Sequence, residues 1–166
     1  MCVYFAHGKE SGPWGTKIQA LAEVAKARGF QVESPDYSST MDPQERVKML
    51  LALKPAAKNL ILVGSSMGGY VSAVASRTLK PRGLFLLAPA FFIDSYPEQS
   101  PRPDAGMTEI IHGWSDDVVP PEHSIRYAGE HKVTLHLVDS DHRLTSALPR
   151  IGDLFAAFLD RDLAQK

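Results

Sequence analysis

The stretch from Leu60 to Tyr70, with the sequence LILVGSSMGGY, constrains the fold more than any other part of the chain. It begins as an apolar, branched run typical of a buried parallel strand, reaches a Gly-x-Ser-x-Gly turn, and continues as a small-residue helical segment. Gly64 and Gly68 lack the Cβ atoms that would collide in so tight a reversal. The turn therefore presents the Ser66 hydroxyl at the start of a helix, where free N–H groups stabilise a developing negative charge. We interpret Ser66 as a candidate nucleophile; the alternative is a serine that only caps the helix.

Strand and helix patterns alternate along the rest of the chain. Short apolar runs predict strands at Cys2–Ala6, Phe30–Ser34, Asn59–Val63, Gly83–Leu87, Met107–His112 and Val133–Val138. Helical spacing and capping residues predict helices at Thr16–Arg28, from Asp42 to before Pro55, and at Ser66–Leu79, Pro121–Glu130 and Leu148–Leu163. Such alternation predicts a three-layer α/β/α sandwich, a parallel sheet of about six strands with helices on both faces, in one domain over residues 1–166.

Ligands of such sheets bind beyond the carboxyl ends of the strands, and the candidate site residues all follow strands. A serine nucleophile needs an adjacent base, which in turn needs an orienting acid. His142, shortly after the last predicted strand, is the candidate base, although alone it would be taken for an exposed loop histidine. Asp116 is the first choice for the acid and Asp117 the second, because both follow the fifth predicted strand. Asp94 is a third possibility, and a plain aspartate turn is the structural alternative.

Backbone donors for an oxyanion are expected at Met67, directly after the serine, and at Lys9, in the loop after the first strand. Gly8 lets that loop approach a ligand closely. His7 and His112 are expected to brace the structure through hydrogen bonds rather than to act in catalysis. None of the six histidines has a recognised metal-ligand spacing, so we expect no metal site, and the chemistry implies no cofactor.

Charge and cysteine content argue against several functions. The chain has 18 basic and 19 acidic residues, and the basic ones are scattered, which argues against a nucleic-acid or anionic membrane partner. No apolar run approaches the ~20 residues that span a bilayer, and the chain opens in a strand rather than a signal peptide. The single cysteine, Cys2, favours a reducing compartment and the role of a small buried hydrophobe. We therefore expect a cytoplasmic protein with a small-molecule substrate; the sequence predicts no oligomeric state.

Taken in order, these motifs resemble those of the α/β-hydrolase superfamily over nearly the whole chain. The resemblance is to small serine esterases without a lid, including bacterial esterase-like proteins and the retinoblastoma-binding protein 9 type. It is carried by His7-Gly8, by residues 64–69, by the run from His112 through Asp116 to Pro120, and by Asp141-His142. It implies that Ser66 is the nucleophile, Asp116 the acid and His142 the base, with the Lys9 and Met67 amides as oxyanion donors.

The resemblance also implies a reduced fold. The chain begins at the family's third strand, so we expect the two usual N-terminal strands to be absent and a strand order of 2-1-3-4-5-6. Where relatives often insert a lid domain, residues 88–106 include Pro97, Pro101 and Pro103, which favour an irregular flap over a helical cap. Asp117 stands where the family often has a proline, so the choice between Asp116 and Asp117 stays open. The predicted pocket is open and shallow, with candidate walls Trp14, Met67, Phe91, Phe92 and Trp114.

The predicted activity is hydrolysis of short-chain carboxylic esters or thioesters through an acyl-enzyme. Activity should fall as acid protonates His142, because an imidazolium cannot act as a base. A cofactor-free haloperoxidase or a peptidase that uses the same triad of Ser66, Asp116 and His142 is a further alternative. The alternative from another class is an interaction module that keeps the fold but binds a protein, since fold alone does not fix function.

Overall fold

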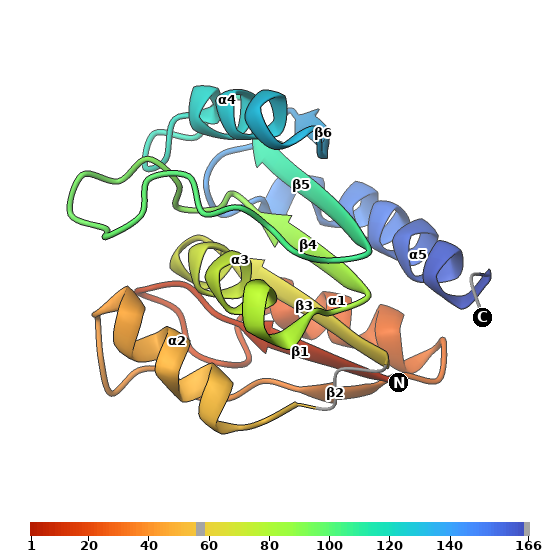
Figure 1. Ribbon diagram of the computed structural model, residues 1–166. Helices are drawn as coiled ribbons and strands as arrows, with labels where there is room; N and C mark the ends of the chain where they lie inside the picture. The colour runs from red at the N-terminus through yellow and green to blue at the C-terminus, as the bar shows by residue number, and fades with distance from the viewer. Residues whose placement is uncertain (56–58, 165–166) are drawn as a thin grey trace.

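The computed structural model describes residues 1–55 and 59–164 and contains a six-stranded sheet in the order β2-β1-β3-β4-β5-β6 (Figure 1). Every neighbouring pair of strands is parallel. This confirms the predicted fold class and the predicted strand order. The strands are β1 (Cys2–Ala6), β2 (Gln31–Glu33), β3 (Leu60–Ser65), β4 (Gly83–Leu87), β5 (Met107–Gly113) and β6 (Thr134–Val138).

Helices cover both faces of this sheet. Helices α1 and α5 pack together on one face, whereas α2, α3 and α4 lie on the other (Figure 1). Each face has its own apolar cluster, so the sheet is buried on both sides and its central strands are continuously apolar. The helices are α1 (Thr16–Lys26), α2 (Pro43–Ala52), α3 (Met67–Leu79), α4 (Pro121–His131) and α5 (Leu148–Ala164).

Aromatic contacts join the layers on each face. Phe85 of β4 packs against Phe155 and Phe158 of α5, with ring centroids 4.9 and 5.2 Å apart. On the opposite face, Phe91 stacks on Tyr127 of α4 at 3.9 Å. These contacts fasten β4 to α5 and the segment after β4 to α4.

Element ends follow local chemistry. The Asp42 side chain accepts hydrogen bonds from the N–H groups of Gln44 and Glu45, so it caps α2 as predicted. Strand β2 is shorter than predicted, because only residues 31–33 pair with β1. Cys2 is half-buried and unpaired rather than fully buried.

Residues 88–106, between β4 and β5, contain neither a helix nor a strand. This agrees with the predicted irregular flap. Among the described residues, no helix combines the length and the apolar character needed to cross a bilayer.

Candidate active site

Ser66 occupies a strained turn between the end of β3 and the start of α3. Its backbone has φ 55° and ψ −117°, a conformation that L-residues rarely adopt. A Cβ atom on Gly64 would lie 2.3 Å from the Gly68 carbonyl oxygen, and one on Gly68 would lie 1.9 Å from the Ala6 oxygen. Only glycine fits at these two positions, so the Gly-x-Ser-x-Gly pattern is a steric requirement of the turn.

Ser66, His142 and Asp116 form one chain of hydrogen bonds. The His142 Nε2 atom lies 3.1 Å from the Ser66 Oγ, and its Nδ1 atom lies 2.7 Å from the Asp116 Oδ2. The imidazole side chain is 19% exposed, whereas the Asp116 carboxylate is completely buried. The structure thus brings together three side chains that are far apart in the sequence and that follow β3, β5 and β6.

The surroundings of Asp116 keep its carboxylate ionised. Burial opposes ionisation, but hydrogen bonds from His142 and from the Val119 and Val118 N–H groups lower the pKa of Asp116 below its ordinary 3.8. An ionised carboxylate only accepts hydrogen bonds, so the proton in this pair sits on His142 Nδ1. The Nε2 atom is then the free base that faces the serine.

His112, at the carboxyl end of β5, supports the same carboxylate from the other side. Its ring is fully buried, and its Nε2 lies 3.0 Å from Asp116 Oδ2 and 2.9 Å from the Val119 oxygen. Its Nδ1 lies 2.7 Å from the Ser124 hydroxyl on α4. Burial lowers the pKa of His112, which favours a neutral ring that donates from Nε2 and accepts from Ser124. The sequence predicted a bracing role for this histidine but not its contact with the acid.

The other two candidate acids lie elsewhere. Asp117 and Asp94 are both exposed, whereas Asp116 is the carboxylate bonded to His142. The geometry therefore favours the first of the three candidates.

The predicted oxyanion donors belong to the two segments next to Ser66, which are the loop after β1 and the first turn of α3. A Cβ atom built on Gly8 would lie 3.5 Å from the Ser66 Cβ, so the loop after β1 borders the nucleophile. The Lys9 N–H has no acceptor within residues 1–55 and 59–164. The Met67 N–H opens α3, where the first N–H groups of a helix have no partner in that helix.

Two polar residues near the site were missed from the sequence. The Arg46 side chain on α2 is 1% exposed and donates to the His7 and Gly8 carbonyls at 3.2 and 3.0 Å. Lys17, on the first turn of α1, interacts electrostatically with Asp116 and Asp141. Burial lowers the pKa of Lys17 to about 8, so it is largely protonated at neutral pH. Neither type of residue has a sequence pattern that distinguishes it from an ordinary surface cation.

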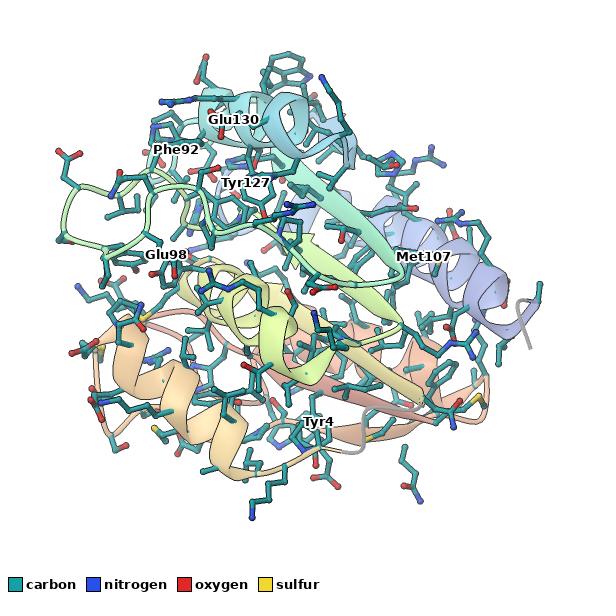
Figure 2. All side chains as sticks on the ribbon, in the orientation of Figure 1. Tyr4, Phe92, Glu98, Met107, Tyr127 and Glu130 are labelled. Atoms are coloured by element: carbon teal, nitrogen blue, oxygen red, sulfur yellow. The ribbon has the colours of Figure 1, made fainter. Side chains whose placement is uncertain are left out.

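The candidate pocket walls divide into exposed and core residues. Trp14 and Trp114 are 43% and 56% exposed and lie on loops at the carboxyl edge of the sheet. Phe91 is buried against Tyr127, and Phe92 lies beside α4 near His123 (Figure 2). Met67 is also buried. The two tryptophans are therefore the apolar groups most open to a ligand.

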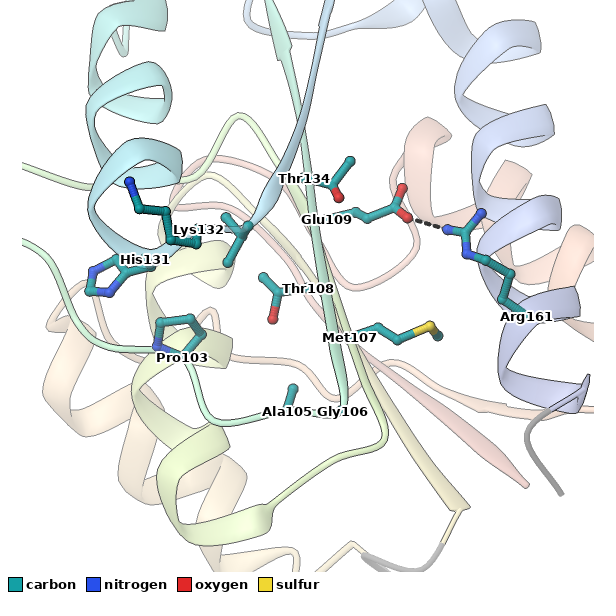
Figure 3. Close-up of a pocket in the computed structure, with 11 residues that line it drawn as sticks. Pro103, Ala105, Gly106, Met107, Thr108, Glu109, His131, Lys132, Thr134 and Arg161 are labelled. Atoms are coloured by element: carbon teal, nitrogen blue, oxygen red, sulfur yellow. Dashed lines mark hydrogen bonds and ion pairs between the residues drawn. The ribbon is translucent and has the colours of Figure 1, made fainter.

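A cavity of about 420 Å³ lies away from the triad, where β5 and β6 begin (Figure 3). Glu109 is paired there with Arg161 and also contacts His136. The triad lies at the opposite, carboxyl end of β5, so this cavity is not the candidate active site. No group of His, Cys, Asp and Glu in the described part of the chain has an arrangement that could hold a metal ion.

Comparisons with known proteins identify similar chains. Residues 1–107 match the uncharacterised protein family UPF0227. A solved structure from Xanthomonas campestris pv. campestris, assigned to the α/β-hydrolase superfamily, is 33% identical, with a TM-score of 0.87 over 96% of this chain and 98% of that one. None of the curated proteins matches the sequence.

Two less similar structures share the fold. Est1E from Butyrivibrio proteoclasticus is 18% identical, with a TM-score of 0.80 over 98% of this chain and 88% of its own. An α/β serine hydrolase without a lid from Xanthomonas campestris is 21% identical, with a TM-score of 0.71 over 96% and 81% of the two chains. At this level of identity, the similarity extends to architecture alone.

Proposed function

Because this chain belongs to the uncharacterised protein family UPF0227 and to the α/β-hydrolase superfamily, we propose that it is a serine hydrolase. Its proposed substrates are short-chain carboxylic esters or thioesters. The observation that carries the proposal is the continuous hydrogen-bonded chain from Ser66 through His142 to Asp116. A serine on a strained turn, bonded to a base that is itself held by a buried carboxylate, is the arrangement needed to activate a hydroxyl.

In the proposed reaction, the Ser66 oxygen attacks the substrate carbonyl while His142 Nε2 takes the hydroxyl proton. The Lys9 and Met67 N–H groups hold the resulting oxyanion, and Asp116 stabilises the imidazolium. Collapse of the tetrahedral intermediate breaks the bond to the alcohol or thiol, which leaves with the proton from His142. Water then attacks the acyl-enzyme with His142 again as base, which releases the acid and restores the serine.

The surroundings of the triad support a small acyl group. Irregular residues 88–106 replace a lid, and the apolar groups at the carboxyl edge, Trp14 and Trp114, are open to solvent. A short chain can contact such a surface without a tunnel, whereas a long chain would leave most of its methylenes in water.

Labelling with a fluorophosphonate probe, followed by turnover of p-nitrophenyl acetate, tests the proposal. Wild-type protein should be labelled, and Ser66→Ala should lose both labelling and turnover, by about 10⁴-fold or more in kcat. Ser39→Ala, which alters an exposed serine outside the site, should behave as wild type. Folded wild-type protein that is neither labelled nor active would contradict the proposal.

A second candidate function is protein binding. It is favoured by the exposed apolar side chains of Trp14, Trp114 and Val118, which are 43%, 56% and 64% accessible. Exposed apolar side chains often mark contact surfaces where they gather into a contiguous patch. The labelling experiment separates the two candidates, because a binding module requires no reactive serine.

A further inference from the structure

We propose that Arg46 is a positioning residue of the oxyanion hole, which holds the Gly8 carbonyl so that the Lys9 N–H faces the reacting centre. The inference rests on the proposed hydrolase function. Arg46 lies on α2, is 1% exposed, and its Nε donates to the Thr40 oxygen at 2.9 Å. Its Nη1 reaches the loop after β1, where it donates to the His7 and Gly8 oxygens. A long cationic side chain is thus buried in order to bind main-chain carbonyls beside the nucleophile.

The Gly8 carbonyl is held by two donors at once. Arg46 Nη1 lies 3.0 Å from this oxygen, and His7 Nδ1 lies 2.8 Å from it. The carbonyl of Gly8 and the N–H of Lys9 belong to one planar trans peptide, in which the two groups point in opposite directions. Fixing the oxygen therefore fixes the direction of the Lys9 N–H, away from Arg46.

The same peptide lies beside the nucleophile. A Cβ atom on Gly8 would be 3.5 Å from the Ser66 Cβ and 3.4 Å from the Ser11 Oγ, so this part of the loop packs directly beside the serine. The Lys9 N–H finds no acceptor in the described part of the chain. A free donor of fixed direction next to Ser66 has the properties that an oxyanion donor requires.

His7 contributes in its neutral form. The Tyr37 N–H donates to His7 Nε2 at 2.9 Å, so the ring proton must sit on Nδ1, from which it is donated to Gly8. Burial lowers the pKa of His7, which keeps the ring neutral at physiological pH. His7 thus holds the Gly8 carbonyl in place, and Arg46 places a positive charge beside this carbonyl.

The Arg46 guanidinium forms no ion pair with a carboxylate in the described residues, although Asp36 lies close enough to interact with it electrostatically. In the described residues, the hydrogen-bond acceptors of Arg46 are three carbonyl oxygens and the Met41 sulfur. A cation bonded to the Gly8 oxygen polarises the peptide and makes the Lys9 N–H a stronger donor. Lysine carries the same charge, but its single ammonium cannot span the Thr40 and Gly8 carbonyls with the fixed geometry of a guanidinium.

The experiment measures kcat, KM and the inhibition constant of a trifluoromethyl ketone for wild type, Arg46→Lys and Arg46→Met. Such a ketone adds the serine and places a negative oxygen in the oxyanion hole. We expect kcat to fall about 10-fold in Arg46→Lys and up to about 100-fold in Arg46→Met, less than or similar to the loss of a whole donor. KM should change less than about twofold, and the inhibition constant should rise in proportion to the loss in kcat/KM.

The matched control is Arg28→Met. This change removes a guanidinium that lies just after the C-terminal end of α1, where it pairs with Asp160. It should leave kcat and the inhibition constant unchanged. Thermal unfolding of each variant identifies a temperature at which all of them are folded, and the kinetics are measured there. If Arg46→Met does not fold, the kinetics of Arg46→Lys test the inference. Folded Arg46 variants with wild-type kcat and inhibitor affinity, or an equal loss in Arg28→Met, would overturn this inference alone. Wild-type protein without turnover or labelling would overturn the proposed function, and this inference with it.

Discussion

At the scale of single residues, the turn at Ser66 can close only because Gly64 and Gly68 have no Cβ atom. We predict that Gly68→Ala destabilises the protein by about 3 kcal/mol or more, because the new Cβ would meet backbone that cannot move aside. The nearest atom, the Ala6 oxygen on β1, would be 1.9 Å away. Urea unfolding measures the loss. Gly129→Ala on α4 is the control, since its Cβ meets nothing within 4 Å and should stabilise the helix by ~1 kcal/mol. Equal stabilities for Gly68→Ala and wild type would contradict the steric argument.

The identity of the triad acid is a second prediction at this scale. We expect Asp116→Asn to lower kcat by roughly 10³- to 10⁴-fold, because an amide no longer holds His142 in the tautomer that leaves Nε2 free. Asp117→Asn, which alters an exposed neighbour, should change kcat less than about twofold. Steady-state kinetics with p-nitrophenyl acetate compares the two variants. A larger loss in Asp117→Asn would reverse the assignment.

Some site residues were predictable from the sequence, and others were not. Ser66, Asp116 and His142 follow strands whose carboxyl ends share an edge, so topology brings them together once the strands are identified. Arg46 had no comparable signal, because its partners are main-chain carbonyls 38 and 39 residues away in the sequence. Backbone carbonyls are present at every residue, so no sequence pattern shows which ones a cation binds.

At the scale of elements, the contact between β5 and α4 makes stability depend on pH. His112 on β5 is bonded to Ser124 on α4, and burial lowers its pKa from 6.5. His112 then binds a proton more readily in the unfolded chain than in the folded one. Its neutral form therefore makes its full contribution to the free energy of unfolding above pH 6.5. This contribution decreases as the pH falls from 6.5 towards the folded pKa. Urea midpoints measured from pH 7.5 to 5 should decrease, and His112→Gln should decrease less steeply. A wild-type slope in His112→Gln would show that other groups cause the effect.

Element boundaries show where local sequence suffices and where pairing decides. Helix α1 ends at Lys26, two residues before the predicted end at Arg28, and Gly29 closes the turn that follows with a φ of +79°, a conformation that suits glycine. Strand β2 is the contrary case, since Phe30 and Ser34 fit a strand but have no partner on β1. Helix ends depend on nearby residues, whereas the extent of a strand depends on which of its residues pair with the neighbouring strand.

At the scale of the whole molecule, the segment between β4 and β5 determines how open the site is. Its internal contacts include the Phe92 N–H bonded to the Gln99 oxygen at 2.8 Å. Arg77 on α3 pairs with Glu98, and the Tyr127 hydroxyl on α4 donates to the Pro101 oxygen. The segment is therefore fastened to α3 and α4, as its course beside these helices in Figure 1 also shows. The prolines predicted its irregular course, but the residues that hold it are distant in sequence and could not be predicted.

For a site without a lid, the dependence of kcat/KM on acyl-chain length should differ from that of an enclosed site. An enclosed apolar tunnel would gain about 0.8 kcal/mol, or roughly fourfold in affinity, for each methylene it buries. On an open surface bordered by Trp14 and Trp114, methylenes beyond the first few stay in water and contribute nothing. We therefore expect kcat/KM for p-nitrophenyl esters to level off or fall beyond about four carbons, where a tunnel would continue to raise it. Because no lid has to open, turnover should also show no jump when the ester or a detergent forms micelles. A fourfold rise per methylene up to twelve carbons, or activation at the micelle threshold, would mean that a closed apolar channel forms around the substrate.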